Sequence, residues 1–317
     1  MTAPEHHDHD VRIPRPETDG RHEPGPDALP LWNESLWFAL YDPLRELGVI
    51  VRWGVQPCLE GGHGNFYLGV LRAGEPVYLA SQQRAPLPAM EPGRIALHNG
   101  LTLEWLEPLR SFRLSFRDGD LGFDLTFVGA SPPYLYDSWK QGPADWVPRH
   151  IEQGGRATGT VTIAGVDHPF DGSAHRDHTF GGERDWDQFY RWNYLAGEID
   201  RFWFNAVRIK FAADMDWLYV GCIFDGERLL ALTDLAIDVR TVQGGARPVG
   251  ARLTLTDEAG KIHRIRTESF HGVCPVLIGR TWLKDHLVRY RMGEAIGYGI
   301  LEHGYREDDA LPELVSE

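Results

Sequence analysis

Residues 175–186, HRDHTFGGERDW, place two histidines, two aspartates, a glutamate and two arginines in one short stretch. Aromatic residues follow at once, namely Trp186, Phe189, Tyr190, Trp192 and Tyr194. A carboxyl group among rings is hard to ionise, because burial in apolar surroundings raises its pKa. The combination therefore indicates a proton donor in an apolar, ring-lined cavity.

The geometry of this motif depends on the local secondary structure. In a β-strand, successive side chains project to opposite faces. The two faces would carry His175, Asp177 and Thr179 on one side and Arg176, His178 and Phe180 on the other. Asp177 and His178 would then share a cavity only across a β-bulge, which the glycines just downstream permit. Which face lines the cavity is left open by the sequence.

The overall charge limits the classes of partner. The chain has 317 residues, a formal net charge of -14 and a pI near 5.4. Nucleic acids and anionic membrane surfaces bind basic surfaces, so the charge disfavours both as main partners. Eleven tryptophans favour a ring-rich core or a ring-lined pocket, and a small hydrophobic substrate suits the latter.

Cysteine spacing and hydropathy indicate the compartment. Cys58, Cys222 and Cys274 form no Cys-x-x-Cys pair, so neither a disulfide framework nor a structural zinc site is predicted. The N-terminal residues lack the basic and apolar segments of a secretory signal, and no apolar run of about eighteen residues could span a bilayer. We expect a cytoplasmic protein without an integral membrane segment. The absence of a nucleotide fingerprint or a Gly-x-Ser-x-Gly elbow predicts no cofactor.

Most of the chain has the pattern of short antiparallel strands. Residues 112–127, FRLSFRDGDLGFDLTF, alternate apolar and polar side chains on both sides of an Asp118-Gly119 turn signal. The same alternation recurs at residues 156–170, and helical periodicity of useful length is scarce. Many short strands with few short helices predict an all-β sandwich or barrel.

Changes of composition divide the chain. The first thirty residues are nearly empty of large apolar side chains, so they cannot offset their ordering entropy and are expected to be disordered. Their cluster of His6, His7 and His9 is interpreted as part of a solvated tail. Alternation lapses near residues 138–155, where Pro and Gly appear. The predicted segments are a tail at 1–30, β domains at 31–147 and 148–306, and an acidic tail at 307–317.

Three segments together resemble the hydroxyneurosporene synthase-like family: residues 33–43, 151–186 and 295–305. The family includes carotenoid 1,2-hydratases, other hydratases and cyclases, and members without assigned activity. The resemblance is most specific at its Arg-Asp-His-x-Trp-Gly motif, which is matched here by Arg176, Asp177, His178 and Gly181, with Arg184 following. Two departures are Phe180 in place of Trp and the second glycine, Gly182. The resemblance implies two lipocalin-like antiparallel β-barrels packed together, in which one face of a strand lines the barrel cavity.

The motif and the resemblance favour a cofactor-independent lyase or cyclase. It would protonate a C=C bond of a hydrophobic, isoprenoid substrate and give hydration or cyclisation. Asp177 is the predicted acid, His178 the assisting base or water holder, and Arg176 the orienting residue. Aromatic faces stabilise a carbocation through their quadrupole. The predicted substrate-binding residues are Trp186, Tyr190, Trp192, Tyr194, Phe180 and Trp105.

Several alternatives are open. Asp177 could be paired with Arg176 or Arg184 in a salt-bridged cluster, which would lower its pKa and remove it as an acid. His175-x-x-His178 with Asp177 offers metal ligands, but on a strand the two histidines face opposite ways, so no metal site is predicted. The same fold could also carry an apolar ligand unchanged, or act as a shape-only isomerase or pericyclase.

Overall fold

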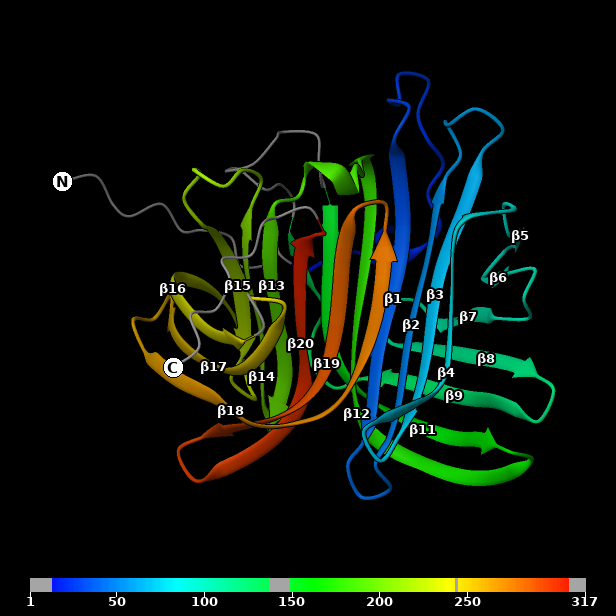
Figure 1. Cartoon of the computed structure of the whole chain (residues 1–317). Helices are drawn as coiled ribbons and strands as arrows, with labels where there is room; N and C mark the ends of the chain where they lie inside the picture. The colour runs from blue at the N-terminus through cyan, green and yellow to red at the C-terminus, as the bar shows by residue number, and fades with distance from the viewer. Residues whose placement is uncertain (1–12, 137–148, 243–244, 308–317) are drawn as a thin grey trace.

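Two antiparallel β structures lie side by side (Figure 1). The computed structural model describes residues 13–136, 149–242 and 245–307. Within these ranges the helices are two short 3-10 turns, η2 (Pro16–Asp19) and η3 (Trp186–Gln188), and none is long and apolar enough to cross a membrane. The predicted all-β fold with two lipocalin-like units is confirmed.

The N-terminal unit is one curved sheet. Its strands are β1 (Trp32–Asp42), β2 (Leu47–Gln56), β3 (His63–Arg72), β4 (Glu75–Ala85), β5 (Ala89–Glu91), β6 (Arg94–Ala96), β7 (Thr102–Glu107), β8 (Ser111–Asp118), β9 (Leu121–Gly129), β10 (Tyr134–Tyr136), β11 (Arg149–Ile163) and β12 (Val166–Glu183). Their order across the sheet is β4-β3-β2-β1-β12-β11-β9-β8-β7-β6-β5, and β10 pairs with β11. This unit forms a half-barrel around its own apolar core.

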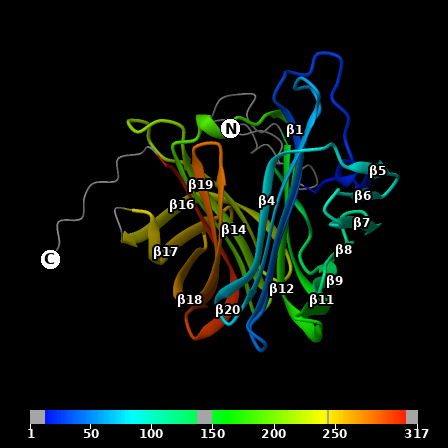
Figure 2. The ribbon, with the colours of Figure 1, turned by 45° about the vertical axis from the view of Figure 1, so that its right-hand side comes forward.

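The C-terminal unit is a closed barrel of consecutive strands. They are β13 (Arg191–Ile199), β14 (Phe202–Lys210), β15 (Leu218–Phe224), β16 (Leu229–Val242), β17 (Arg247–Asp257), β18 (Ile262–Ile278), β19 (Thr281–Met292) and β20 (Ala295–Arg306). Strands β18 and β20 pack against β3, β4, β1 and β12 of the first sheet, and β13 packs against β11 and β12. The turned view in Figure 2 shows β19 and β20 beside this sheet.

The chain passes from one sheet to the other between Glu183 and Arg191. The predicted division at residue 147 does not coincide with this change of sheet. The lapse in alternation at residues 138–155 overlaps the start of a long hairpin, β11–β12, and β12 pairs with β1 along Tyr41 to Trp32. The hairpin therefore supplies the hydrogen-bond partners that the edge of β1 needs, and it belongs to the first sheet.

Strands at the contact between the units are buried on both faces. On β1, Leu36 and Phe38 enter the core of the first sheet, whereas Trp37 and Ala39 enter the cluster shared with the barrel. This double burial explains the nearly continuous apolar run of β1, since a strand with one solvated face alternates instead. The barrel packs its own interior separately, around residues such as Phe204.

The N-terminal segment differs from the predicted disordered tail. Residues 13–30 are ordered against the first sheet, and the Asp19 side chain is fully buried. The buried ion pair between Asp19 and Arg176 anchors this segment, which has few large apolar side chains of its own. Residues 1–12, with His6, His7 and His9, and residues 308–317 lie outside the described residues.

Candidate active site

A pocket opens between the first sheet and the outer face of the barrel. It encloses about 710 Å³ of empty space, part of it open to solvent. Trp37 and Tyr67 line it from the first sheet, and Val207 and Leu283 line it from the barrel; all four belong to the apolar cluster shared by the two units. The resemblance implies a cavity inside a lipocalin-like barrel, whereas this pocket lies between the two units.

The first sheet presents one row of side chains to this pocket. The register pairs Tyr67 with Arg52, Arg52 with Trp37, Trp37 with Asp177, and Asp177 with Glu152. Directly paired residues of antiparallel strands project to the same face. All five side chains accordingly line the pocket.

The barrel presents a second row to the same pocket. Across β14, β13, β20, β19 and β18 the paired residues are Val207, Tyr194, Glu302, Asp285 and Cys274. Val207, Tyr194 and Glu302 line the pocket, and Asp285 lies directly behind Glu302.

Hydrogen bonds join the two rows. The Tyr67 hydroxyl donates to Asp285 Oδ2 at 3.0 Å. The Tyr194 hydroxyl donates to Glu152 Oε2 at 2.5 Å. Asp177 is next to Glu152 in the sheet row, and Glu302 is next to Asp285 in the barrel row. The two contacts therefore bracket Asp177 and Glu302, which lie on facing walls of the pocket.

Asp177 is a carboxyl group that faces the pocket between Trp37 and Glu152. Among the described residues no side chain forms a hydrogen bond or ion pair with its carboxyl group, and the surface it keeps accessible faces the pocket. Burial raises the pKa of Asp177 to about 6, and the Glu152 carboxylate adds to this effect, while His150, Arg52 and Arg184 oppose it. About a tenth of the Asp177 side chains therefore remain protonated at pH 7. Asp177 is therefore not in a salt bridge with Arg176 or Arg184, the alternative that the sequence left open.

Glu152, its neighbour, is a fixed anion. It accepts hydrogen bonds from His150 Nε2 at 2.5 Å and from His175 Nε2 at 2.6 Å. The Trp203 indole donates to His175 Nδ1 at 3.1 Å, so the proton of His175 lies on Nε2, towards Glu152. Burial raises the pKa of Glu152, but the two histidines outweigh it and lower the value to about 2. Glu152 therefore supplies a permanent negative charge beside Asp177.

Asp285 and Glu302 form a hydrogen-bonded carboxyl pair in the barrel wall. The Trp37 indole and the Tyr67 hydroxyl donate to Asp285 Oδ2 at 3.4 and 3.0 Å, and the Trp192 indole donates to Glu302 Oε1. Two buried carboxyl groups in contact cannot both ionise. Burial and the charge of Glu302 raise the pKa of Asp285 well above its ordinary value, and burial also raises the pKa of Glu302. The pair therefore shares one proton, carried by Asp285.

Two arginines flank an aromatic wall of the pocket. The guanidinium carbons of Arg52 and Arg184 lie 5.3 and 5.2 Å from the ring centroid of Trp186. Burial lowers the pKa of both arginines, that of Arg184 to about 9. Their charges partly balance the carboxyl groups, and their planes hold the Trp186 ring in position.

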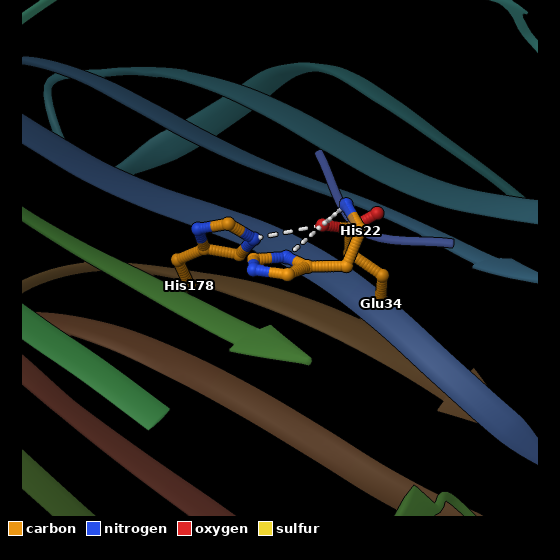
Figure 3. A group of neighbouring side chains, drawn as sticks. All are labelled: His22, Glu34 and His178. Carbon is orange, nitrogen blue, oxygen red and sulfur yellow. Dashed lines mark hydrogen bonds and ion pairs between the residues drawn. The ribbon is translucent and has the colours of Figure 1, made fainter. Parts of the chain in front are cut away.

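Arg176 and His178 lie on the opposite face of β12, inside the first sheet. Arg176 forms a bidentate ion pair with Asp19 at 2.8 and 3.0 Å. His178 Nδ1 lies 3.2 Å from Asp19 Oδ1, and its Nε2 lies 3.1 Å from Glu34 Oε1, beside His22 (Figure 3). Pairing of β12 with β1 and β11 continues without a bulge here, so alternation separates these residues from Asp177. Of the two faces that the sequence left open, the structure therefore places Asp177 on the pocket face and Arg176 and His178 on the other.

The atoms of His22, Glu34 and His178 that could bind a metal ion lie within 4.8 Å of one another. Both nitrogens of His178 already face carboxylates. Burial lowers the pKa of His178, but hydrogen bonds to Asp19 and Glu34 outweigh this and raise it to about 9. A protonated imidazole between two carboxylates accounts for the arrangement by charge balance. The cluster joins the N-terminal segment to the sheet.

Replacing His178 with glutamine is expected to lower the free energy of unfolding at pH 7 by about 2–4 kcal/mol while turnover stays close to that of the wild type. Because the pKa of His178 is raised in the fold, its contribution to stability is present below about pH 6.5 and lost as pH rises through about 9. Urea unfolding across this range measures both effects. His168→Gln, at the far end of the same strand, is the control. Loss of turnover with unchanged stability would contradict this placement of His178.

The predicted aromatic residues divide into two groups. Trp186, Trp192 and Tyr194 line the pocket. Phe180, Trp105 and Tyr190 are not among the lining residues.

Each of these three has a clear reason for its position. Phe180 shares the inner face of β12 and stacks on His22 with ring centroids 3.8 Å apart. Trp105 packs on the core of the first sheet, and its indole donates to the Asp19 carbonyl at 2.6 Å. Tyr190 precedes β13, which begins at Arg191, so the alternation that aligns Trp192 does not extend to it.

Sequence reasoning missed several pocket residues, namely Trp37, Arg52, Tyr67, His150, Glu152 and Glu302. Trp37, Glu152 and Glu302 lie in the three segments that carry the family resemblance, so those segments were a usable signal. Arg52 is a single charge within the apolar run VIVRWGV, and such a charge inside a buried strand indicates a polar site.

The fold and the site define an all-β protein with two lipocalin-like units and an ionisable pocket between them. Residues 15–306 match the family described as a domain of unknown function, DUF7064, and the chain belongs to that family. No curated protein matches the chain.

Several solved structures share the fold. A candidate AttH protein from Nitrosomonas europaea aligns with a TM-score of 0.69 and 14% identity, over 95% of this chain and 98% of that one. Kievitone hydratase from Nectria haematococca aligns with a TM-score of 0.61 and 12% identity, over 92% and 93%. CghA, which has also been solved with Sch210972, aligns with a TM-score of 0.63 and 11% identity, over 88% and 89%. At these identities the likeness establishes the fold alone.

Proposed function

We propose that this protein is a cofactor-independent lyase or cyclase that protonates a C=C bond of a hydrophobic, isoprenoid substrate in the pocket between the two units. One observation carries the proposal. Asp177 is a carboxyl group of raised pKa that faces this pocket without a hydrogen bond or ion pair from the described residues. Such a group is suited to give its proton to carbon, because burial raises its pKa and no direct hydrogen bond or ion pair from the described residues holds its anion.

The chemistry proceeds in two steps. The Asp177 carboxyl group transfers its proton to the less substituted carbon of the double bond, and the π electrons form the new C–H bond. The tertiary carbocation that remains lies against the rings of Trp186, Phe189 and Trp192, each of which stabilises it by about 0.5–2 kcal/mol. Water then forms the C–O bond and loses a proton, which gives hydration. A hydroxyl group of the substrate does the same in cyclisation.

Two further observations support the proposal. Kievitone hydratase, which is named as a hydratase, has the same fold, and the resemblance to the hydroxyneurosporene synthase-like family implies the same range of reactions. Among the described residues, Cys58, Cys222 and Cys274 form no disulfide bond, which suits the cytoplasmic location that we propose, since reducing compartments disfavour disulfides.

Incubation in D₂O with a panel of phenols that carry a 3-methylbut-2-enyl group tests the proposal. We expect a hydrated or cyclised product with one deuterium bound to carbon, detected by mass spectrometry and NMR. A product without carbon-bound deuterium would instead indicate shape-only isomerisation. Recovery of the ligand unchanged after long incubation would indicate a carrier. Either result contradicts protonation of the double bond.

A further inference from the structure

We infer that Glu302 is a second catalytic residue, the base that removes the proton from the attacking water or hydroxyl group, and that Asp285 is the residue that positions it. The inference rests on the proposed function. It assigns acid and base to opposite walls of one pocket, with the acid on the first sheet and the base on the barrel.

The register places Glu302 for this role. Glu302 lines the pocket, and the contacts of Tyr67 with Asp285 and of Tyr194 with Glu152 bring the barrel row against the row of Asp177. A substrate between the rows therefore meets a carboxyl group on each side. The two groups are not in hydrogen-bond contact, so each is free to exchange a proton with what lies between them.

The difference in burial decides which carboxyl group of the pair carries the charge. Asp285 is paired with Glu302 across β19 and β20; Asp285 is fully buried and does not line the pocket, whereas Glu302 lines it. Glu302 Oε1 accepts from the Trp192 indole. Asp285 Oδ2 likewise accepts from the Trp37 indole and the Tyr67 hydroxyl, so the number of hydrogen bonds does not separate the two groups. Burial and the charge of Glu302 raise the pKa of Asp285 well above its ordinary value, so the shared proton is assigned to Asp285 and the charge to Glu302. Like-charge carboxyl pairs that share one proton are an established means of activating water.

In this mechanism Asp177 gives up one proton and Glu302 takes up one proton. Asp177 loses its proton to carbon, and the Glu302 carboxylate takes the proton of the attacking oxygen as the C–O bond forms. After the reaction Asp177 is ionised and Glu302 is protonated. Proton exchange with solvent then returns both carboxyl groups to their starting protonation states. Because proton and oxygen arrive from opposite walls, they add to opposite faces of the double bond. Anti addition is the expected stereochemistry.

The test compares Glu302→Gln with Asp177→Asn in D₂O, on the same prenylated phenols, with Glu294→Gln at an exposed turn as control. Both variants should lose product formation by about 100- to 10,000-fold. Glu302→Gln should still exchange deuterium into the alkene carbon of recovered substrate, because Asp177 can protonate and deprotonate it, whereas Asp177→Asn should not. Full product formation by Glu302→Gln would overturn the inference without affecting the proposed function, and loss of exchange in both variants would also overturn it.

Two further measurements keep the inference testable if Glu302→Gln does not fold. Infrared spectroscopy of the substrate-free protein at pH 7 should show a protonated carboxyl band that Asp285→Asn removes and Asp177→Asn keeps; its persistence in Asp285→Asn would overturn the inference. Asp285→Asn, whose amide still donates to Glu302, should keep most of the turnover. Asp285→Ala should move the acidic limb of the pH–rate profile to higher pH, and an unmoved limb would contradict a positioning role.

Discussion

Replacing Asp177 with asparagine is expected to lower turnover on a prenylated substrate by about 100- to 10,000-fold. Asparagine keeps the shape of the side chain but has no acidic proton to give to carbon. Steady-state kinetics with a confirmed substrate measures the effect. Asp171→Asn is the matched control, because Asp171 lies on the same strand in an exposed ion pair with Arg156. Full turnover by a folded Asp177→Asn protein would exclude Asp177 as the acid.

The pKa of Asp177 predicts opposite effects of the same substitution on activity and stability. In the proposed mechanism the protonated form of Asp177 is the active one, so kcat/KM of the wild type should fall as pH rises through about 6. A raised pKa in the fold also means that stability is greatest below the ordinary value of 3.8 and is lost as pH rises through about 6. Asp177→Asn should therefore be more stable than the wild type at pH 7, by at most about 3 kcal/mol. A less stable variant would contradict the raised pKa.

Replacing Asp19 with asparagine is expected to lower the free energy of unfolding by about 3–5 kcal/mol. Asp19 and Arg176 are both fully buried, and Asp19 also faces His178. Asparagine would leave the Arg176 guanidinium as a buried charge without its counterion, which is the costly way to break a buried pair. Denaturant unfolding at pH 7 measures the loss, and Glu17→Gln in the same short helix is the exposed control.

The same substitution has a defined pH dependence. Burial opposes ionisation of Asp19, but Arg176 and His178 outweigh it and lower its pKa to about 2. The stability that Asp19 contributes is therefore present above pH 3.8 and lost as pH falls through about 2. The difference between wild type and Asp19→Asn should disappear in strong acid, and a difference that persists there would require another cause.

Local patterns were sufficient for the fold class and for the two faces of the motif strand. Alternation at residues 112–127 predicts the β8–β9 hairpin, and the structure forms it. Alternation also separates Asp177 from Arg176 and His178, as the structure confirms. The assignment of His178 to the cavity required a bulge, and the ladder on both sides of β12 is regular there.

The rest of the site depends on contacts between residues far apart in the chain. Asp19 and Arg176 are 157 positions apart, and no local pattern links a polar N-terminal segment to a buried arginine. Glu302 meets the row of Asp177 only because β20 of the barrel packs against β1 and β12. Alternation predicts which residues share a face, but not what that face packs against, so the position of the pocket between the units could not be predicted.

The two walls of the pocket belong to separate sheets that touch mainly through apolar side chains such as Ile50 and Leu287. Apolar contacts are not directional, whereas the hydrogen bonds from Tyr67 to Asp285 and from Tyr194 to Glu152 align the two rows. Substitutions that change the size of the apolar side chains at these contacts would therefore change the distance between the carboxyl groups of Asp177 and Glu302. Substrate width and reaction outcome are thereby adjustable from positions that never meet the substrate.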